Sequence, residues 1–229
     1  MIIKNLVTAV VILIIMAVSS AFAQSKYEAS TVLKEKFTDK SGAPLTGKGV
    51  IIGDVDSGID VFHPMFFFAD GGEFTFVDVN GDGSLTIGED GVDKNGNGKI
   101  ESSEILRYQE IRDNTWGMLT SLGQVAGKYN PEFDFLYVDV NGNKKRDFGT
   151  KAGFTENDPS YGEQFFISID ENKNGKIEAG EKLVGLKTSK IRSVRQRDDV
   201  VRRRGIDLIE TEEDKNGHGT GVAGLIIGG

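Results

Sequence analysis

A single long apolar run opens the chain, and short apolar runs separated by Gly, Asn and Asp clusters follow it. Residues 6–18 are apolar except for Thr8, Lys4 precedes them, and Ala21-Phe22-Ala23 places small residues before Gln24. A basic residue, a short apolar run and a small-residue cleavage site are typical of a secretory signal peptide. The pattern predicts a signal peptide at residues 1–23 and a mature chain, 24–229, that is secreted, periplasmic or at the cell surface. The alternative is an uncleaved anchor, the one case in which we expect membrane binding.

Two short segments of the mature chain have the pattern of a buried core. Val50-Ile51-Ile52 and Val55 predict a buried strand that ends at residues 56–58, and such runs are typical of a parallel sheet covered by helices. Residues 214–229 consist largely of small and apolar residues and predict a helix. We therefore expect core pieces at about 45–68 and 214–229, divided by an insertion at about 69–213.

The insertion repeats one local pattern. The runs 74–77, 133–138 and 165–169 are aromatic or β-branched, and each leads into an Asp-x-Asn-x-(Asp/Asn) segment. Short runs of this kind predict strands, and the polar segments predict tight loops. The insertion is therefore predicted to be rich in β-structure.

Three of the loops have the spacing of a calcium-binding loop. Oxygen donors at positions 1, 3, 5 and 9, a glycine at 6 and an acid at 12 let a tight loop surround a hard cation. The predicted ligands are, in the first loop, Asp78, Asn80, Asp82, Thr86 and Glu89; in the second, Asp93, Asn95, Asn97, Glu101 and Glu104; in the third, Asp170, Asn172, Asn174, Glu178 and Glu181. A fourth segment at Asp139 fits less well, because Lys144 replaces the glycine and Thr150 the acid. The alternative for each loop is an Asn-Gly turn without metal.

Charge and composition narrow the function classes. The chain has 27 Lys and Arg against 35 Asp and Glu, a net charge of −8, so we expect no nucleic-acid partner. The absence of cysteine excludes disulfides, thiolate metal sites and a cysteine nucleophile. Because an extracellular chain without disulfides needs another stabiliser, calcium is the expected structural cofactor.

Two motifs flank the insertion and carry candidate catalytic residues. Residues 55–64 read V-D-S-G-I-D-V-F-H-P, and residues 216–224 read N-G-H-G-T-G-V-A-G. A carboxylate at a strand end can orient a histidine and stabilise its charged form. Both motifs resemble the aspartate and histidine motifs of subtilisin-like serine proteases (subtilases). The resemblance implies that Asp56 orients His218, that His218 is the general base and acid, and that the substrate is a protein or peptide.

The chain departs from that family in one respect that matters for catalysis. The Gly-Thr-Ser-x-Ala segment that carries the family's nucleophile does not occur in these 229 residues. We therefore expect an α/β, incomplete subtilisin-like three-layer fold with a parallel sheet, interrupted by a β-rich calcium-binding insertion. The expected function is that of a secreted, calcium-stabilised serine endopeptidase, present as a fragment that is inactive alone. The alternatives are a non-catalytic extracellular calcium-binding or adhesive module and a pseudoprotease.

Overall fold

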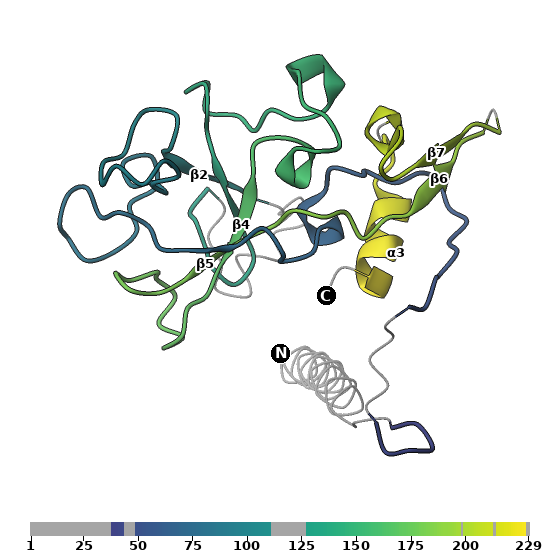
Figure 1. Cartoon of the computed structure of the whole chain (residues 1–229), viewed down its shortest axis with the longest axis horizontal. Helices are drawn as coiled ribbons and strands as arrows, with labels where there is room; N and C mark the ends of the chain where they lie inside the picture. Colours follow the sequence, from purple (N-terminus) through teal and green to yellow (C-terminus); the bar gives the residue numbers. More distant parts are fainter. Residues whose placement is uncertain (1–37, 44–48, 111–126, 198, 213, 228–229) are drawn as a thin grey trace, which may run out of the picture. The chain divides into compact units, whose positions relative to one another are not determined.

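The structure, a computed structural model of the 229-residue chain, describes residues 38–43, 49–110, 127–197, 199–212 and 214–227 (Figure 1). The chain divides into two units, residues 1–53 and 54–229. The predicted signal peptide lies outside the described residues. Among the residues described, no helix has the length and apolar character needed to cross a membrane.

The larger unit is built around a five-stranded sheet. Its strand order is β1-β5-β4-β3-β2, and each neighbouring pair is antiparallel. The strands are β1 (Glu73–Phe74), β2 (Leu106–Gln109), β3 (Phe135–Val138), β4 (Phe165–Ser168) and β5 (Leu183–Gly185). A separate antiparallel hairpin pairs β6 (Ser193–Arg195) with β7 (Val201–Arg203).

Helices are short in the described part of the chain. Four 3-10 turns occur there, η1 (Pro64–Phe66), η2 (Thr150–Ala152), η3 (Pro159–Tyr161) and η4 (Leu208–Glu210). The one α-helix described is α3 (His218–Ile227), which contacts η1. The prediction of a helix within residues 214–229 is confirmed.

The central strands bury side chains on both faces of the sheet. Because successive side chains of a strand alternate between the faces, Tyr137 and Phe165 pack on one side, and Leu136 and Phe166, which are paired in register, pack on the other. The first side contacts η1, η4 and α3 through a cluster that includes Phe66, Leu208 and Ala223. The second side packs against the loops of the insertion, for example through Ile177. One sheet thus separates the candidate catalytic motifs from most of the predicted metal loops.

The predicted strands of the insertion are confirmed at β3 and β4, and the first is shorter than expected, since β1 ends at Phe74. The predicted buried strand at 50–55 is wrong. Val50, Ile51 and Ile52 are 53–67% exposed, Val55 is 98% exposed, and none of them is in a strand. A parallel strand needs parallel neighbours for its hydrogen bonds, whereas every described strand pair is antiparallel. The expected parallel sheet and three-layer arrangement are therefore not found among the described residues.

Candidate functional site

The start of helix α3 is fixed by the carboxylate of Asp214. Its Oδ1 accepts the amide N–H of Asn216 at 3.0 Å, and its Oδ2 accepts both the amide N–H of Thr220 at 3.1 Å and the Thr220 hydroxyl at 2.8 Å. The first amides of a helix have no partners within the helix, and an aspartate before the helix commonly supplies one. His218, the first residue of α3, is therefore held in a defined position.

The two candidate catalytic motifs meet at the first turn of α3. The amide N–H of Asp60 donates to Thr220 Oγ1 at 2.8 Å, and the amide N–H of Gly219 donates to Ser57 Oγ at 3.3 Å. A Cβ atom at Gly219 would lie only 2.1 Å from the carbonyl oxygen of Gly58. Only glycine permits this close approach of helix and loop, so the H-G-T spacing has a direct steric reason.

Asp56 and His218 form a hydrogen-bonded pair across 162 residues of sequence. Asp56 Oδ1 lies 2.7 Å from His218 Nδ1. The Asp56 side chain is 16% exposed and the imidazole 68% exposed, so the other side of the ring faces solvent. The pairing predicted from the two motifs is present in the structure.

The pair shifts the pKa of each partner in the direction that favours charge. The amide N–H of Ser57, followed by His218, lowers the pKa of Asp56 below its ordinary value. The hydrogen bond to Asp56 raises the pKa of His218 above 6.5. The second histidine behaves in the opposite way, because burial lowers the pKa of His63. A histidine held by an ionised carboxylate is suited to accept and return a proton.

Side chains of the insertion pack against the first motif, residues 55–64. The rings of Phe62 and Phe148 lie 4.7 Å apart, and the guanidinium of Arg146 lies 3.8 Å from the ring centre of Phe165. Arg146 also donates to the carbonyl oxygens of Glu163 at 2.9 Å and Ser160 at 2.6 Å. Burial lowers the pKa of Arg146 to about 9, and the negative charge of Asp60 in the first motif opposes that shift. Arg146 remains charged at neutral pH.

Arg146 was not identified from the sequence as a structurally important residue, although its position in the loop pattern is unusual. It occupies position 8 of the Asp139 segment, where the other loops have an apolar residue, Leu85, Ile100 or Ile177. Ile177 packs into the core, and Leu85 packs against the same cluster. The arginine thus replaces an apolar contact with a half-buried charge near Asp60.

The predicted metal loops share one backbone geometry. We refer to each loop by its first residue, as loop 78, loop 93, loop 139 and loop 170. The first aspartate accepts the amide N–H of position 6, at 2.8 Å in loop 78, 2.7 Å in loop 93 and 2.7 Å in loop 170. Positions 4 and 6 of all four loops have positive φ; six of these eight residues are glycine, and the other two are Lys173 and Lys144. Tight turns that point several oxygens inward require this backbone.

A second, buried carboxylate closes each of these loops. In loop 93, Glu104 accepts the amide N–H of Lys94 at 2.9 Å and that of Glu101 at 3.2 Å. In loop 170, Glu181 accepts the amides of Glu171 and Glu178 at 3.0 and 2.8 Å. The predicted closing acids of these two loops therefore hold backbone amides at positions 2 and 9.

In loop 78 the acid that accepts the amides of positions 2 and 9 is Asp90, next to Glu89, the acid predicted as a ligand at position 12. Asp90 is fully buried, and its two oxygens accept the amides of Val79 at 2.9 Å and Thr86 at 2.6 Å. Glu89 is exposed and accepts a long 3.4 Å hydrogen bond from the Asn80 side chain. The sequence has acids at both position 12 and position 13. The calcium-loop spacing selects position 12, so it did not predict the role of Asp90.

The remaining predicted ligands converge within each loop. Asn80 donates to Thr86 at 3.2 Å, and the Thr86 hydroxyl donates to Asp82 at 3.3 Å. The other two loops hold their position-9 glutamate by asparagine amides: Asn95 and Asn97 donate to Glu101 at 3.0 and 2.7 Å, and Asn172 donates to Glu178 at 2.7 Å. Asn174 accepts the amide N–H of Lys176 at 2.9 Å.

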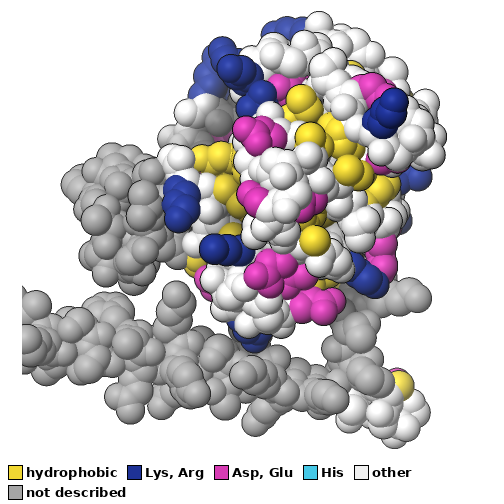
Figure 2. All heavy atoms as spheres, turned by 90° about the vertical axis from the view of Figure 1, so that its left-hand side faces the viewer, with side chains coloured by type: hydrophobic (Ala, Val, Ile, Leu, Met, Phe, Trp, Pro, Cys, Tyr) yellow, Lys and Arg dark blue, Asp and Glu magenta, His cyan; other side chains and the backbone are white. Residues whose placement is uncertain are grey.

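These donor sets mix carboxylates with amide oxygens. Over the described ranges, no group of three or more His, Asp or Glu side chains is placed to hold a metal by such side chains alone. A cation at these loops would also depend on asparagine and backbone oxygens, which hard cations accept. Figure 2 shows the face at the left of Figure 1, where Asp and Glu side chains are interspersed with Lys and Arg.

Comparison with known proteins identifies a family but no individual relative. The family model described as the subtilase family matches residues 47–229. No curated protein and no solved structure matches the chain.

The two histidines are predicted to titrate on opposite sides of pH 6.5. In an NMR titration of the ring protons, His218 should show a pKa above 6.5 and His63 a pKa below it. Asp56→Asn should return the His218 pKa towards 6.5 and leave His63 unchanged. Because the His218 pKa is raised and the Asp56 pKa is lowered, the stability from this pair is lost as the pH rises through the His218 pKa or falls through the Asp56 pKa. A His218 pKa that is the same with and without the Asp56 carboxylate would contradict the pairing.

The closing role of Asp90 predicts unequal effects for two neighbouring substitutions. Asp90→Asn places an amide N–H₂ against one of two backbone N–H groups and should lower the free energy of unfolding by about 1 to 3 kcal/mol. Glu89→Gln, at an exposed position, should change it by less than about 0.5 kcal/mol. Urea unfolding with a chelator present measures both values without a metal contribution. Equal effects of the two substitutions would show that Asp90 has no special role.

Proposed function

The chain belongs to the subtilase family of serine proteases, and on that premise we propose that it forms part of a secreted, calcium-stabilised serine endopeptidase. Protein or peptide substrates follow from the family itself. The observation that carries the proposal is the 2.7 Å contact between Asp56 Oδ1 and His218 Nδ1. Two motifs so distant in sequence meet as a carboxylate–imidazole pair, which is the arrangement that general acid–base catalysis uses.

In the proposed reaction, His218 takes the proton of a serine hydroxyl and later returns it to the leaving amine. Asp56 holds Nδ1, so that Nε2 is the nitrogen that faces the serine, and it stabilises the imidazolium as this forms. Since the imidazole is 68% exposed, a serine could approach it from the solvent side.

The nucleophile and the oxyanion donors are not among the 229 residues, which contain no Gly-Thr-Ser-x-Ala segment. Without a nucleophile the Asp56–His218 pair cannot complete acyl transfer. We therefore propose that these residues alone are inactive and that the activity belongs to a longer protein.

Calcium is the proposed structural cofactor. In loops 78, 93 and 170, the side chains at positions 1, 3, 5 and 9 are carboxylates, amides or a hydroxyl, and all offer the oxygen atoms that calcium prefers. The asparagines are neutral, which reduces the charge of each site and suits the high calcium concentration outside cells. The residues present therefore fit the ion. Calcium would supply positive charge that holds the loops, with no role in the chemical step.

A second candidate function is a non-catalytic extracellular calcium-binding module or pseudoprotease. The regular geometry of the loops supports it, because this geometry does not depend on the catalytic pair. Secretion is common to both proposals, and the mature protein would begin at Gln24. The assay below separates the two.

The protease proposal predicts loss of activity at the catalytic pair. The gene should first be sequenced beyond codon 229, and the reading frame should encode Gly-Thr-Ser-x-Ala. In that longer protein, hydrolysis of a fluorogenic peptide should fall roughly 10⁴-fold in kcat for Asp56→Asn, because the histidine loses its orientation. Asp54→Asn, a nearby exposed carboxylate, is the matched control and should keep nearly full activity.

Two outcomes would contradict the protease proposal. A stop codon directly after codon 229 would favour the non-catalytic module. An intact reading frame whose product neither cleaves peptides nor labels with a serine-directed phosphonate would favour the pseudoprotease.

The calcium proposal predicts metal-dependent thermal stability. A ligand that binds only the folded state stabilises it by about 2.7 kcal/mol at a concentration 100 times its dissociation constant. The unfolding temperature of the chain should therefore rise with millimolar calcium, rise less with magnesium, and fall again with chelator. The combined variant Asp78→Asn, Asp93→Asn and Asp170→Asn should lose most of the rise. Identical melting curves in calcium and in chelator would exclude this proposal.

A further inference from the structure

Loop 139 has the backbone of the other three loops although its sequence departs from their pattern. Lys144 occupies position 6 with a φ of 65°, where the others have glycine, and Gly142 occupies position 4 with a φ of 74°. Asn141 and Asn143 accept the amide N–H two residues further on, at 3.0 and 2.7 Å. The same turns hold Asn95 and Asn97 in loop 93, at 3.0 and 2.8 Å.

The closing acid that loop 139 lacks in its sequence is supplied by Glu163. Its two carboxylate oxygens accept the amides of Val140 at 2.7 Å and Asp147 at 2.9 Å. These amides are positions 2 and 9 of the loop, the same two that Asp90 holds in loop 78. Glu163 is 2% exposed and precedes β4, so it reaches the loop through the tertiary structure.

One buried carboxylate oxygen of this loop has no hydrogen-bond partner among the residues that the structure describes. The Asp139 side chain is 1% exposed; its Oδ2 accepts the amide N–H of Lys144 at 3.0 Å and pairs with Arg107 Nε at 3.4 Å. Its Oδ1 is buried and accepts no hydrogen bond from the residues that the structure describes. In loops 78 and 93 the corresponding oxygen accepts the amide of Gly81 or Gly96. A buried carboxylate oxygen without a donor is costly, and a cation would satisfy it.

Three further side chains of the loop converge on one point. The side-chain amides of Asn141 and Asn143 both donate to Asp147 Oδ2, at 2.5 and 2.7 Å. The Oδ1 atoms of Asn141 and Asn143 each accept one backbone amide, and an amide oxygen has a second lone pair that can bind a cation. These three side chains could then face a cation together, and position 7, Lys145, could add its carbonyl oxygen.

We propose that loop 139 is a fourth cation site of this protein, and that it takes calcium through Asp139, Asn141, Asn143, Asp147 and the carbonyl of Lys145. Glu163 closes the loop from outside without touching the ion. Only oxygen donors are present, and they lie on a flexible loop, which favours calcium over the smaller magnesium ion with its strict octahedral geometry.

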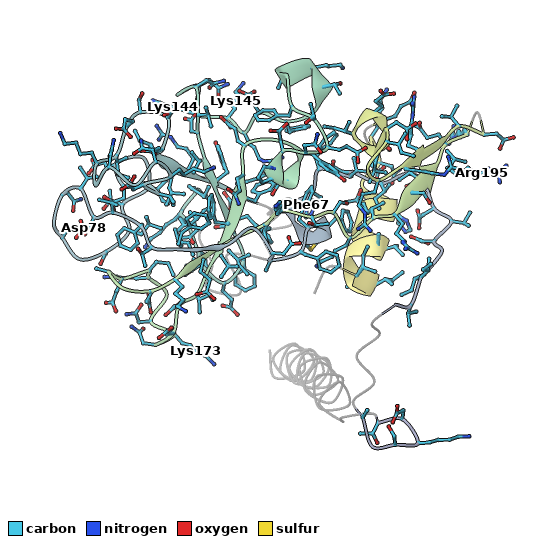
Figure 3. The ribbon with its side chains drawn as sticks, viewed as in Figure 1. Phe67, Asp78, Lys144, Lys145, Lys173 and Arg195 are labelled. Atoms are coloured by element: carbon cyan, nitrogen blue, oxygen red, sulfur yellow. The ribbon has the colours of Figure 1, made fainter. Side chains whose placement is uncertain are left out.

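The site should be weak. Only two of its side-chain donors are carboxylates, Arg107 competes for Asp139, and Lys144 and Lys145 add positive charge nearby. Both lysines are exposed, and Figure 3 places them at the outer edge of the molecule, where water screens their charge. The expected dissociation constant is about 10⁻⁴ to 10⁻³ M, the range of extracellular modules.

The test is a calcium titration of the ¹⁵N-labelled chain, followed by the backbone amide signals of residues 140–147. These signals should move with calcium and saturate in the millimolar range. Asp147→Asn should weaken the response at least tenfold and leave the responses of loops 78, 93 and 170 in place. Glu132→Gln removes the same charge at an exposed position outside the loop and is the matched control.

The residue-resolved signals distinguish this proposal from that for the other loops. If loops 78, 93 and 170 respond to calcium and loop 139 does not, the fourth site is refuted while the calcium proposal for the other three stands. If Asp147→Asn and Glu132→Gln give the same binding curve, the assigned ligands are wrong. An unperturbed His218 signal in each variant shows that the fold is intact.

Discussion

Loops 78, 93, 139 and 170 contain backbone N–H groups that have no partner in a strand or helix, and carboxylates accept their hydrogen bonds. In each of the four loops an aspartate at position 1 accepts the amide of position 6, and a second acid accepts the amides of positions 2 and 9. An unpaired buried N–H costs about as much as a lost hydrogen bond. The abundance of Asp, Asn and Gly in the insertion follows from this constraint before any metal is considered.

The same constraint connects the loops to the sheet. The closing acids Glu104 and Glu163 lie just before β2 and β4, and Glu181 lies just before β5. A strand that enters the sheet therefore brings its preceding acid to a loop. Loops 78 and 170 are joined further, because the amide N–H of Leu85 donates to the carbonyl oxygen of Ile177 at 2.7 Å. Loop geometry and sheet register thus stabilise each other.

The elements that carry the Asp56–His218 pair pack on the opposite face of this sheet. Ala223 of α3 and Val61 of the first motif belong to the same core cluster as Phe165 of β4, whereas Phe166, the next residue, faces the loops. Arg146 bridges the two regions, since it is part of loop 139, packs on Phe165 and carries its charge near Asp60. An ion bound at loop 139 would therefore lie one residue from a side chain that supports the first motif.

The sequence by itself determined the local features, because these depend on neighbouring residues. The turns and loops, two of the insertion strands, the helix that begins at His218 and the identity of Asp56 and His218 all follow from short motifs. Only the tertiary structure decided which distant groups meet. The hydrogen bonds of Asp90 and Glu163 to backbone amides, and the contact of Arg146 with Phe165, depend on strand register, which no spacing rule contains. The strand predicted at 50–55 failed for the same reason, since an apolar run becomes a buried strand only where neighbouring strands pair with it.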